Sequence, residues 1–220
     1  MKKLFLALMA IAAIALTGCE KGKDEPEQKS SKENGHEWVD LGLPSGIKWA
    51  TCNVGATKPE EYGGYFAWGE TSPKTTYDWI TYFDTQNNGS TFIKYNNDGG
   101  KTVLDLADDA AHVNWGGSWR MPTKEEQDEL RTKCTWTWTQ KNGINGYEVK
   151  GLNDNSIFLP AAGMRYLSVY DNVGTDGDYW ASSLYSGGSY YACYLDFDSN
   201  NKDWDYDYRN YGQSIRPVCK

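Results

Sequence analysis

The residues NWGGSWRMPTKEEQDEL, positions 114–130, carry the clearest local structural signal in the chain. Thr123 follows Pro122 directly and precedes Glu126 by three positions, which is the pattern of a capping box. In such a box the threonine hydroxyl accepts a hydrogen bond from the Glu126 backbone N–H, and the glutamate carboxylate accepts one from the backbone N–H of the cap. The pattern predicts a helix that runs from Thr123 to about Lys133.

After this helix the sequence alternates between polar and apolar residues with the period of two that is typical of strands. The segment CTWTWTQ, residues 134–140, places Cys134, Trp136 and Trp138 on one face. Residues 142–151 and 156–163 read as a pair of strands linked as a hairpin. Further strands of a meander are expected at residues 179–183, 190–198 and 212–219.

The strand at residues 190–198 has an expected orientation. Its buried face is predicted to consist of Cys193, Leu195 and Phe197. Asp196 and Asp198 occupy the alternate positions and are expected to point outward. The last two strands are expected to be centred on a turn near Asp205.

The sequence of the N-terminal half indicates shorter strands and a shorter helix. Residues 37–55 indicate two strands around a turn at Pro44-Ser45-Gly46, and residues 65–70 indicate another strand. Residues 71–101 are polar and predict a long surface excursion. Residues 104–112 predict a short helix. The expected class is α+β, with two helices packed on twisted, mainly antiparallel strands with long loops.

The first nineteen residues indicate an export signal. Lys2 and Lys3 precede an apolar run over residues 4–16, which is too short and wrongly flanked for a stable transmembrane helix. The run Leu16-Thr17-Gly18-Cys19 resembles the lipobox of bacterial lipoproteins, in which the cysteine is lipidated and becomes the new N-terminus. We therefore expect residues 1–18 to be a signal peptide and Cys19 to carry lipid that anchors the protein in a membrane. The alternative is an ordinary secretory signal with a chance cysteine.

The composition of the mature chain bounds its partners. The chain has 22 basic and 30 acidic residues, and removing Lys2 and Lys3 leaves 20 against 30, a net charge of about −10. Such a charge opposes binding to nucleic acid. Residues 19–36 contain no aliphatic or aromatic side chain after the cysteine, which predicts a flexible acidic stalk. All 10 tryptophans and all 16 tyrosines follow it, so residues 37–220 are expected to form a single domain.

Four cysteines remain in this domain. An even number of cysteines in an exported protein indicates disulfides, and four allow three pairings. We favour Cys52–Cys134 and Cys193–Cys219. The alternative is that some of them stay reduced and buried as small apolar side chains.

Five stretches of the chain carry a family resemblance: residues 38–56, 65–71, 114–130, 157–165, and 179–183 with 195–197 and 214–218. In this order they resemble the Fibrobacter succinogenes major paralogous domain over nearly all of residues 38–218. Gln127 departs from the family, whose helix more often has Trp after Glu-Glu. The resemblance implies a C-type-lectin-like fold related to formylglycine-generating-enzyme domains, and it implies surface binding or adhesion.

The sequence does not favour an enzyme. Relatives that generate formylglycine use two cysteines close together near the C-terminus, whereas Cys193 and Cys219 are far apart. An iron site like that of sulfoxide synthases would require three histidines, whereas His112 is the single histidine of the domain. His112 is expected to cap or pack its helix. No nucleotide or phosphate-binding motif is present. A non-canonical envelope enzyme remains the alternative from another class.

One segment combines acidic and aromatic residues. Residues 171–207 contain eight aspartates, and Lys202 is the only basic residue among them. Carboxylates in such loops are ligands that Ca²⁺ accepts, so calcium is a possible cofactor, although the spacing matches neither an EF-hand loop nor the Glu-Pro-Asn and Trp-Asn-Asp motifs of calcium-dependent lectins. Aromatic rings stack on sugar C–H faces while carboxylates accept hydrogen bonds from hydroxyls. The alternative is a hairpin whose aromatic residues pair across strands. The candidate ligand-binding residues are Asp196, Asp198, Asp203, Trp204, Asp205, Tyr206, Asp207 and Tyr208.

These observations predict an outer-membrane lipoprotein of the cell envelope, expected to face outward. Its lectin-like domain is expected to bind an extracellular glycan or protein, and a pure protein-interaction or assembly module is the remaining alternative.

Overall fold

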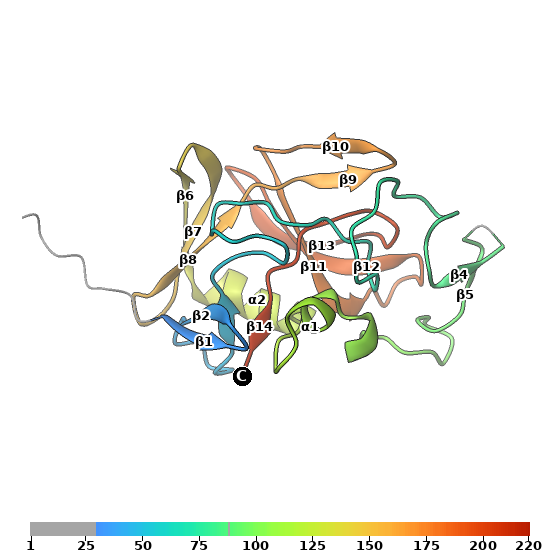
Figure 1. The fold of residues 1–220 in the computed structure, drawn as a ribbon, viewed down its shortest axis with the longest axis horizontal. Helices are drawn as coiled ribbons and strands as arrows, with labels where there is room; N and C mark the ends of the chain where they lie inside the picture. Colours follow the sequence, from blue (N-terminus) through green and yellow to red (C-terminus); the bar gives the residue numbers. More distant parts are fainter. Residues whose placement is uncertain (1–29, 88) are drawn as a thin grey trace, which may run out of the picture.

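The computed structural model describes residues 30–87 and 89–220. The fold is α+β: mostly β-sheet with two α-helices, α1 (Ala110–Trp115) and α2 (Lys124–Lys133), as Figure 1 shows. A 3₁₀ turn, η1 (Leu106–Asp108), precedes α1. The predicted signal peptide and Cys19 lie outside the described residues. In the part of the chain that the structure describes, no helix is both long and apolar enough to cross a membrane.

Within residues 30–87 and 89–220, the strands form three sheets and two small hairpins. The first sheet has the order β1-β2-β3-β14, with β1 (Ser30–Glu33), β2 (His36–Asp40), β3 (Lys48–Ala50) and β14 (Val218–Cys219). The second consists of β6 (Thr135–Lys141), β7 (Ile144–Lys150) and β8 (Ser156–Pro160), and the third of β11 (Gly177–Leu184), β12 (Tyr191–Phe197) and β13 (Lys202–Tyr208). The hairpins are β4 (Thr85–Gln86) with β5 (Thr91–Phe92), and β9 (Met164–Tyr166) with β10 (Val169–Asp171).

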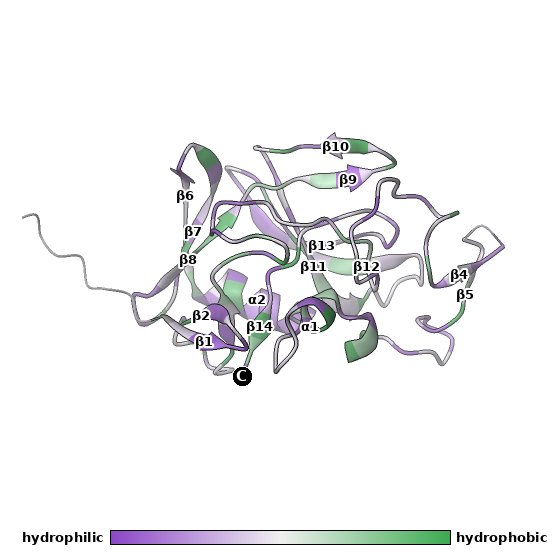
Figure 2. Cartoon of the chain, in the orientation of Figure 1, coloured by the Kyte–Doolittle hydropathy of each residue, from purple (hydrophilic) through white to green (hydrophobic). Residues whose placement is uncertain are grey.

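The β11–β12–β13 sheet lies between two hydrophobic clusters. Trp180 of β11 belongs to one cluster and its neighbour Tyr179 to the other, because consecutive residues of a strand point to opposite faces. On β12, Ala192 joins the first cluster and Leu195 the second. The hydrophobic residues of β8 and β14 stand out in Figure 2, whereas the β1–β2 hairpin is mostly hydrophilic. The whole of β11 is buried, so it is the centre of the domain.

The capping box is present as predicted. Thr123 Oγ1 accepts the Glu126 N–H at 3.3 Å, and Glu126 Oε2 accepts the Thr123 N–H at 2.9 Å. Arg120 donates two further hydrogen bonds to the same carboxylate, at 2.6 and 2.7 Å. The helix ends at Lys133, also as predicted. Gln127 is 2% exposed and donates to Tyr179 O at 2.8 Å, so it ties the helix to the central strand.

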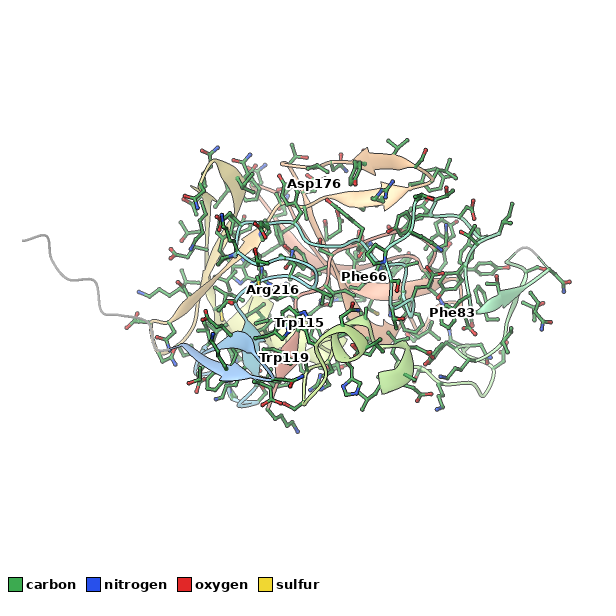
Figure 3. The ribbon with its side chains drawn as sticks, viewed as in Figure 1. Phe66, Phe83, Trp115, Trp119, Asp176 and Arg216 are labelled. Atoms are coloured by element: carbon green, nitrogen blue, oxygen red, sulfur yellow. The ribbon has the colours of Figure 1, made fainter. Side chains whose placement is uncertain are left out.

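The N-terminal boundary of the domain differs from the prediction. The stalk was expected to reach residue 36, but β1 begins at Ser30 and pairs with β2 in an antiparallel hairpin. The indole N–H of Trp119 donates to Glu33 O at 2.7 Å, and the His36 ring stacks on Trp115 at 3.9 Å. Trp115 is the last residue of α1, and Trp119 is labelled close to it in Figure 3. Backbone pairing and these contacts order a segment that has no aliphatic side chain of its own.

Residues 71–101 are not only a surface excursion. This segment, the lobe, buries Tyr77, Tyr82, Asp84 and Tyr95. Asp84 Oδ2 lies 2.5 Å from the Arg209 guanidinium, and both side chains are nearly inaccessible to solvent. The same carboxylate accepts the backbone N–H groups of residues 94 and 95. This buried ion pair fixes the lobe, which carries β4 and β5, to the end of the central sheet.

Three further predictions were wrong in detail. Residues 104–112 form η1 and the start of α1 rather than one helix, because the Asp109 side chain accepts the His112 N–H and begins a new helix. Residues 65–70 make one isolated bridge, Phe66 with Gln213, rather than a strand. Asp205 lies in the middle of β13 rather than in a turn, and residues 212–219 contribute only β14.

The predicted disulfides are not formed. Cys52, Cys134, Cys193 and Cys219 are all free thiols. Cys52 and Cys219 belong to one hydrophobic cluster, whereas Cys134 packs against the other, at the C-terminal end of α2. The preferred pairing Cys52–Cys134 therefore joins residues from different clusters. Burial raises the pKa of each thiol, which is the behaviour of a small apolar side chain.

Candidate functional site

The predicted ligand segment forms a regular antiparallel hairpin, β12–β13. Its turn lies at residues 198–201, where Asp198 Oδ1 accepts the N–H groups of Asn200 and Asn201 at 2.5 and 2.9 Å. Asp198 is therefore a turn residue, and these hydrogen bonds hold its pKa below the usual range. The cross-strand pairs include Leu195 with Trp204 and Asp196 with Asp203. All eight predicted ligand residues thus lie on one hairpin, but on two faces of it.

The aspartates of β13 occupy the free edge of the sheet. Asp203, Asp205 and Asp207 each accept the backbone N–H of the following residue, at 2.8, 2.8 and 2.7 Å. Strand β13 is the outer strand of its sheet, and a row of unpaired N–H groups at such an edge invites pairing with another chain. The alternating acids therefore cap this edge, which is a structural explanation for the DWDYDY pattern.

The aromatic residues of β13 lie on the opposite face from its aspartates. The Lys124 ammonium group lies 3.8 Å from the centre of the Trp204 ring, so α2 covers this ring. Tyr206 stacks on Tyr185 at 3.9 Å and contacts Tyr191 across the hairpin at 5.3 Å. The cross-strand pairing of aromatic residues that we considered as an alternative is therefore present.

These rings continue into an array that reaches the lobe, which we call the aromatic strip. Tyr191 contacts Tyr208 at 4.8 Å, and Tyr208 contacts Trp79 at 6.0 Å. Trp79 in turn lies 5.7 Å from both Phe92 and Tyr190, which are 4.9 Å from each other. The strip consists of Trp79, Phe92, Tyr185, Tyr190, Tyr191, Tyr206 and Tyr208. Tyr190, Tyr206 and Tyr208 each keep more than a third of their surface exposed.

A hollow of about 510 Å³ opens at the lobe end of the strip. Phe92 and Tyr190 contribute its aromatic surface. Its polar lining consists of Ser90, Thr91, Asn96, Asp98, Gly188 and Ser189. A second hollow of about 340 Å³ lies over β6–β8, where the lining aromatic residue, Phe158, is 5% exposed. The first hollow therefore combines accessible rings with hydroxyl, amide and carboxylate groups.

Hydrogen bonds hold the walls of this hollow. Asn96 Oδ1 accepts the N–H groups of Asp98 and Gly100, each at 3.0 Å. Ser189 Oγ accepts the N–H of Asn97 at 2.9 Å, which joins the lobe to the turn after β11. Arg209 donates to Ser189 O at 2.8 Å, and its guanidinium lies 4.5 Å from the centre of the Phe92 ring. The buried ion pair with Asp84 thus positions both aromatic walls.

The other face of the hairpin carries an unusual set of carboxyl groups. Asp178 of β11 is 6% exposed, and burial followed by the charge of Asp196 raises its pKa to about 8. Burial also raises the pKa values of Asp196 and Asp207 to about 6. Asp196 was expected to point outward, but it lies between Asp178 and Asp203 and is only partly exposed. Among residues 30–87 and 89–220, no group of three His, Cys, Asp or Glu is placed to hold a metal ion.

Sequence reasoning singled out residues 196–208 and included Asp178 in an aspartate-rich stretch, but it found neither the hollow nor the burial of Asp178. Phe92, Asn96 and Asp98 come from the lobe, which was read as an excursion without a site. The sequence signal for them is the aromatic content of the lobe, which is unusual for a solvated loop. His112 Nδ1 lies 3.1 Å from Trp119 O, so it packs as expected. We compared the chain with known protein families, with curated proteins and with solved structures, and none of the three comparisons found a match.

Proposed function

We propose that this protein is an outer-membrane lipoprotein whose domain binds an extracellular glycan at the aromatic strip and the hollow. The observation that carries the proposal is the hollow itself, where the accessible Tyr190 and Phe92 rings meet the side chains of Asn96, Asp98 and Ser189. Sugar rings present C–H faces that pack on aromatic rings, and their hydroxyls exchange hydrogen bonds with amide, carboxylate and hydroxyl groups.

The size and rigidity of the hollow support this assignment. A volume of about 510 Å³ lies within the roughly 300–1,000 Å³ of typical ligand sites. The walls are held by hydrogen bonds and by the buried Arg209–Asp84 ion pair, so little conformational freedom remains to be lost on binding. The strip extends from the hollow along β13, and its length favours a chain of several sugar units over a single one.

The proposed location of the protein, anchored by lipid in the outer membrane, fits the same function. The lipobox-like Leu16-Thr17-Gly18-Cys19 provides a lipid anchor, and residues 20–29 provide a polar tether between the lipid and β1. The resemblance to the major paralogous domain family, with its C-type-lectin-like fold, supports surface binding and adhesion. The net charge of about −10 favours neutral or cationic glycans over phosphate-bearing polymers.

A protein partner is the second candidate, and a different surface favours it. The β9–β10 hairpin exposes Tyr166, Leu167, Val169, Tyr170 and Val173. Val169 and Tyr170 are 60% and 58% exposed. Exposed apolar groups that gather on one hairpin are typical of protein-interaction surfaces.

A glycan array probed with the full chain tests the proposal. The detergent should be of the polyoxyethylene type, which carries no sugar. Wild type is expected to bind at least one class of oligosaccharide, and Tyr190→Ala and Phe92→Ala are expected to lose that binding. Tyr170→Ala is the matched control, because it removes an exposed aromatic residue outside the strip. Binding that survives in both hollow variants but is lost in Tyr170→Ala places the ligand at the β9–β10 hairpin and contradicts the proposal.

A further inference from the structure

The register of the central sheet gathers carboxyl groups on one face. Asp178 of β11 is paired with Asp196 of β12, which is paired with Asp203 of β13. The next row is Trp180, Tyr194 and Asp205. Because directly opposite residues of antiparallel strands point to the same side, these groups share one face. We call Asp178, Asp196, Asp205 and Asp207, with Tyr194 among them, the acidic face. All four carboxylates act on Tyr194 and raise its pKa, although burial is the largest cause.

Two buried side chains at this face lack hydrogen-bond donors. The Asp178 carboxyl group is 6% exposed and receives no hydrogen bond from the described residues. Gln213 is fully buried and donates from Nε2 to Asp207 Oδ2 at 3.4 Å, while its Oε1 has no partner within the described ranges. A buried acceptor without a donor costs about 1–3 kcal/mol. Gln213 Oε1 is such a buried acceptor at one end of the face, so the component that it lacks is a donor.

Carboxylates make the largest electrostatic contributions to the raised pKa of Asp178. The charged groups that face it are Asp171 of β10, Asp176 of the loop before β11, Asp196 of β12 and Asp207 of β13. Asp176 lies near the top of the molecule in Figure 3, toward the β9–β10 side of the sheet. Asp203, the outermost carboxyl group of the row that contains Asp178 and Asp196, is paired with Arg131 of α2 at 3.5 Å and is therefore not counted in the acidic face. A ligand that completes this face must therefore bring positive charge as well as hydrogen-bond donors.

We propose that the acidic face binds a protonated primary amine of an amino sugar. An ammonium group has three donors and no acceptor, which matches a face of unsatisfied acceptors. A compact metal ion is a poorer fit, because it needs several oxygens to converge at about 2.4 Å, and the described residues hold no such group. Neighbouring carboxyl groups on adjacent strands, such as Asp178 and Asp196, are spaced so that an ammonium group can bridge them.

The acidic face adjoins the aromatic strip. Tyr208 of the strip contacts Tyr211 at 5.6 Å, and Tyr211 contacts Tyr166 at 4.8 Å. The charge of Asp207, next to Tyr208 in the chain, helps burial raise the pKa of Tyr211 to about 12. The inference rests on the proposed glycan function and specifies its ligand: sugar rings pack along the strip, and an amine substituent passes the free edge of β13 to the carboxyl groups on the other face of the sheet.

Calorimetry with two oligomers of equal length tests this. One is a glucosamine oligomer with free amines, and the other is its fully N-acetylated counterpart, each titrated into the full chain in polyoxyethylene detergent at pH 6. We expect the amine form to bind at least about tenfold more tightly. Asp178→Asn and Asp196→Asn should remove this preference and leave binding of the N-acetylated form within about twofold. Asp154→Asn, which removes a charge at an 85% exposed side chain elsewhere, should change neither.

Proton release gives a second readout. At pH 6 the Asp178 carboxyl group is mostly protonated, because its pKa is about 8, so binding of an ammonium group should release protons. Calorimetric titrations in buffers of different ionisation enthalpy measure the number of protons released per ligand bound. Asp178→Asn should lower this number.

Equal affinity for the two oligomers overturns the inference while leaving the proposed function intact. An amine preference that persists in both Asp variants also overturns it, as does an equal loss of both oligomers in those variants. If neither oligomer binds wild type, the proposed function fails for these sugars. The amine site is then tested by itself: free glucosamine and N-acetylglucosamine are each added to the protein, and the NMR chemical shifts of the acidic-face residues are compared. Shifts caused by glucosamine alone support the amine site, and equal or absent shifts overturn it. Binding of a lysine peptide without binding of either amine sugar overturns it as well.

Discussion

Asp178→Asn is expected to stabilise the domain above neutral pH. An unfolded aspartate has a pKa of about 3.9, whereas burial and the neighbouring carboxylates raise the pKa of Asp178 to about 8 in the fold. The folded state therefore holds this proton more tightly than the unfolded state, and stability falls as pH rises from about 4 to about 8. Each pKa unit corresponds to about 1.4 kcal/mol, which sets an upper limit of roughly 6 kcal/mol on the loss.

Entry of water beside an ionised Asp178 reduces this figure, so we expect a difference of roughly 2–3 kcal/mol at pH 8.5. The amide has nearly the same shape as the carboxyl group but does not ionise, so the variant should not show this loss. Urea unfolding of both proteins at pH 4.5, 6.5 and 8.5 measures it. The stability difference between variant and wild type should grow across the series. A constant difference, or one that shrinks with rising pH, refutes the assignment of a neutral buried acid.

Other perturbations have equally defined outcomes. Arg209→Met leaves Asp84 buried without its partner and should lower the unfolding free energy by about 3–5 kcal/mol, while limited proteolysis shifts to residues 71–101; unchanged cleavage contradicts the role of the ion pair. Thr123→Ala removes the helix cap and should cost about 0.5–2 kcal/mol in urea unfolding, and no loss contradicts the capping box. Trp204→Ala should change glycan affinity by less than about twofold, because the ring lies under Lys124 outside the strip, and a tenfold loss in calorimetry contradicts this placement. Thiol titration of the unfolded, unreduced domain should find all four cysteines free, and a lower number means that disulfides form.

Local signals were read correctly from the sequence. The capping box at Thr123 fixes the start of α2 through contacts between residues three apart, so the prediction needed no knowledge of the fold. The alternation in residues 134–140 likewise predicted a strand, which the structure has as β6, with its two tryptophans half-buried on one side. These elements depend on contacts between residues that are close in the sequence, so they can be predicted from the sequence alone.

Features that depend on distant partners were missed. Arg209 and Asp84 are separated by 125 positions, and no pattern in the sequence around either residue indicates that they pair. Arg216 was read as part of a strand, yet its buried guanidinium donates to Asn53 Oδ1 and to the carbonyl groups of Ala50 and Phe158. The hydrogen bonds of Arg216, labelled in Figure 3, account for the burial of residues 212–219 without a long strand.

The candidate site shows the same division. Period-two alternation in residues 202–208 is a strand signal, but the aspartates were weighed as turn formers, and this moved the expected turn to Asp205. The raised pKa of Asp178 could not be inferred, because it requires the cross-strand neighbour Asp196 and burial under the adjoining loops. Composition singled out residues 196–208, and only the fold separates the acidic face of this hairpin from its aromatic strip.

The central claim is that a glycan packs on the rings of the hollow. Its most direct test is calorimetric titration of the strongest array ligand into the full-length wild type and Tyr190→Ala. Loss of the 41% exposed ring should weaken binding by about tenfold or more, which is about 1.4 kcal/mol, with urea unfolding unchanged. Equal affinity of the two proteins for that ligand would contradict the account.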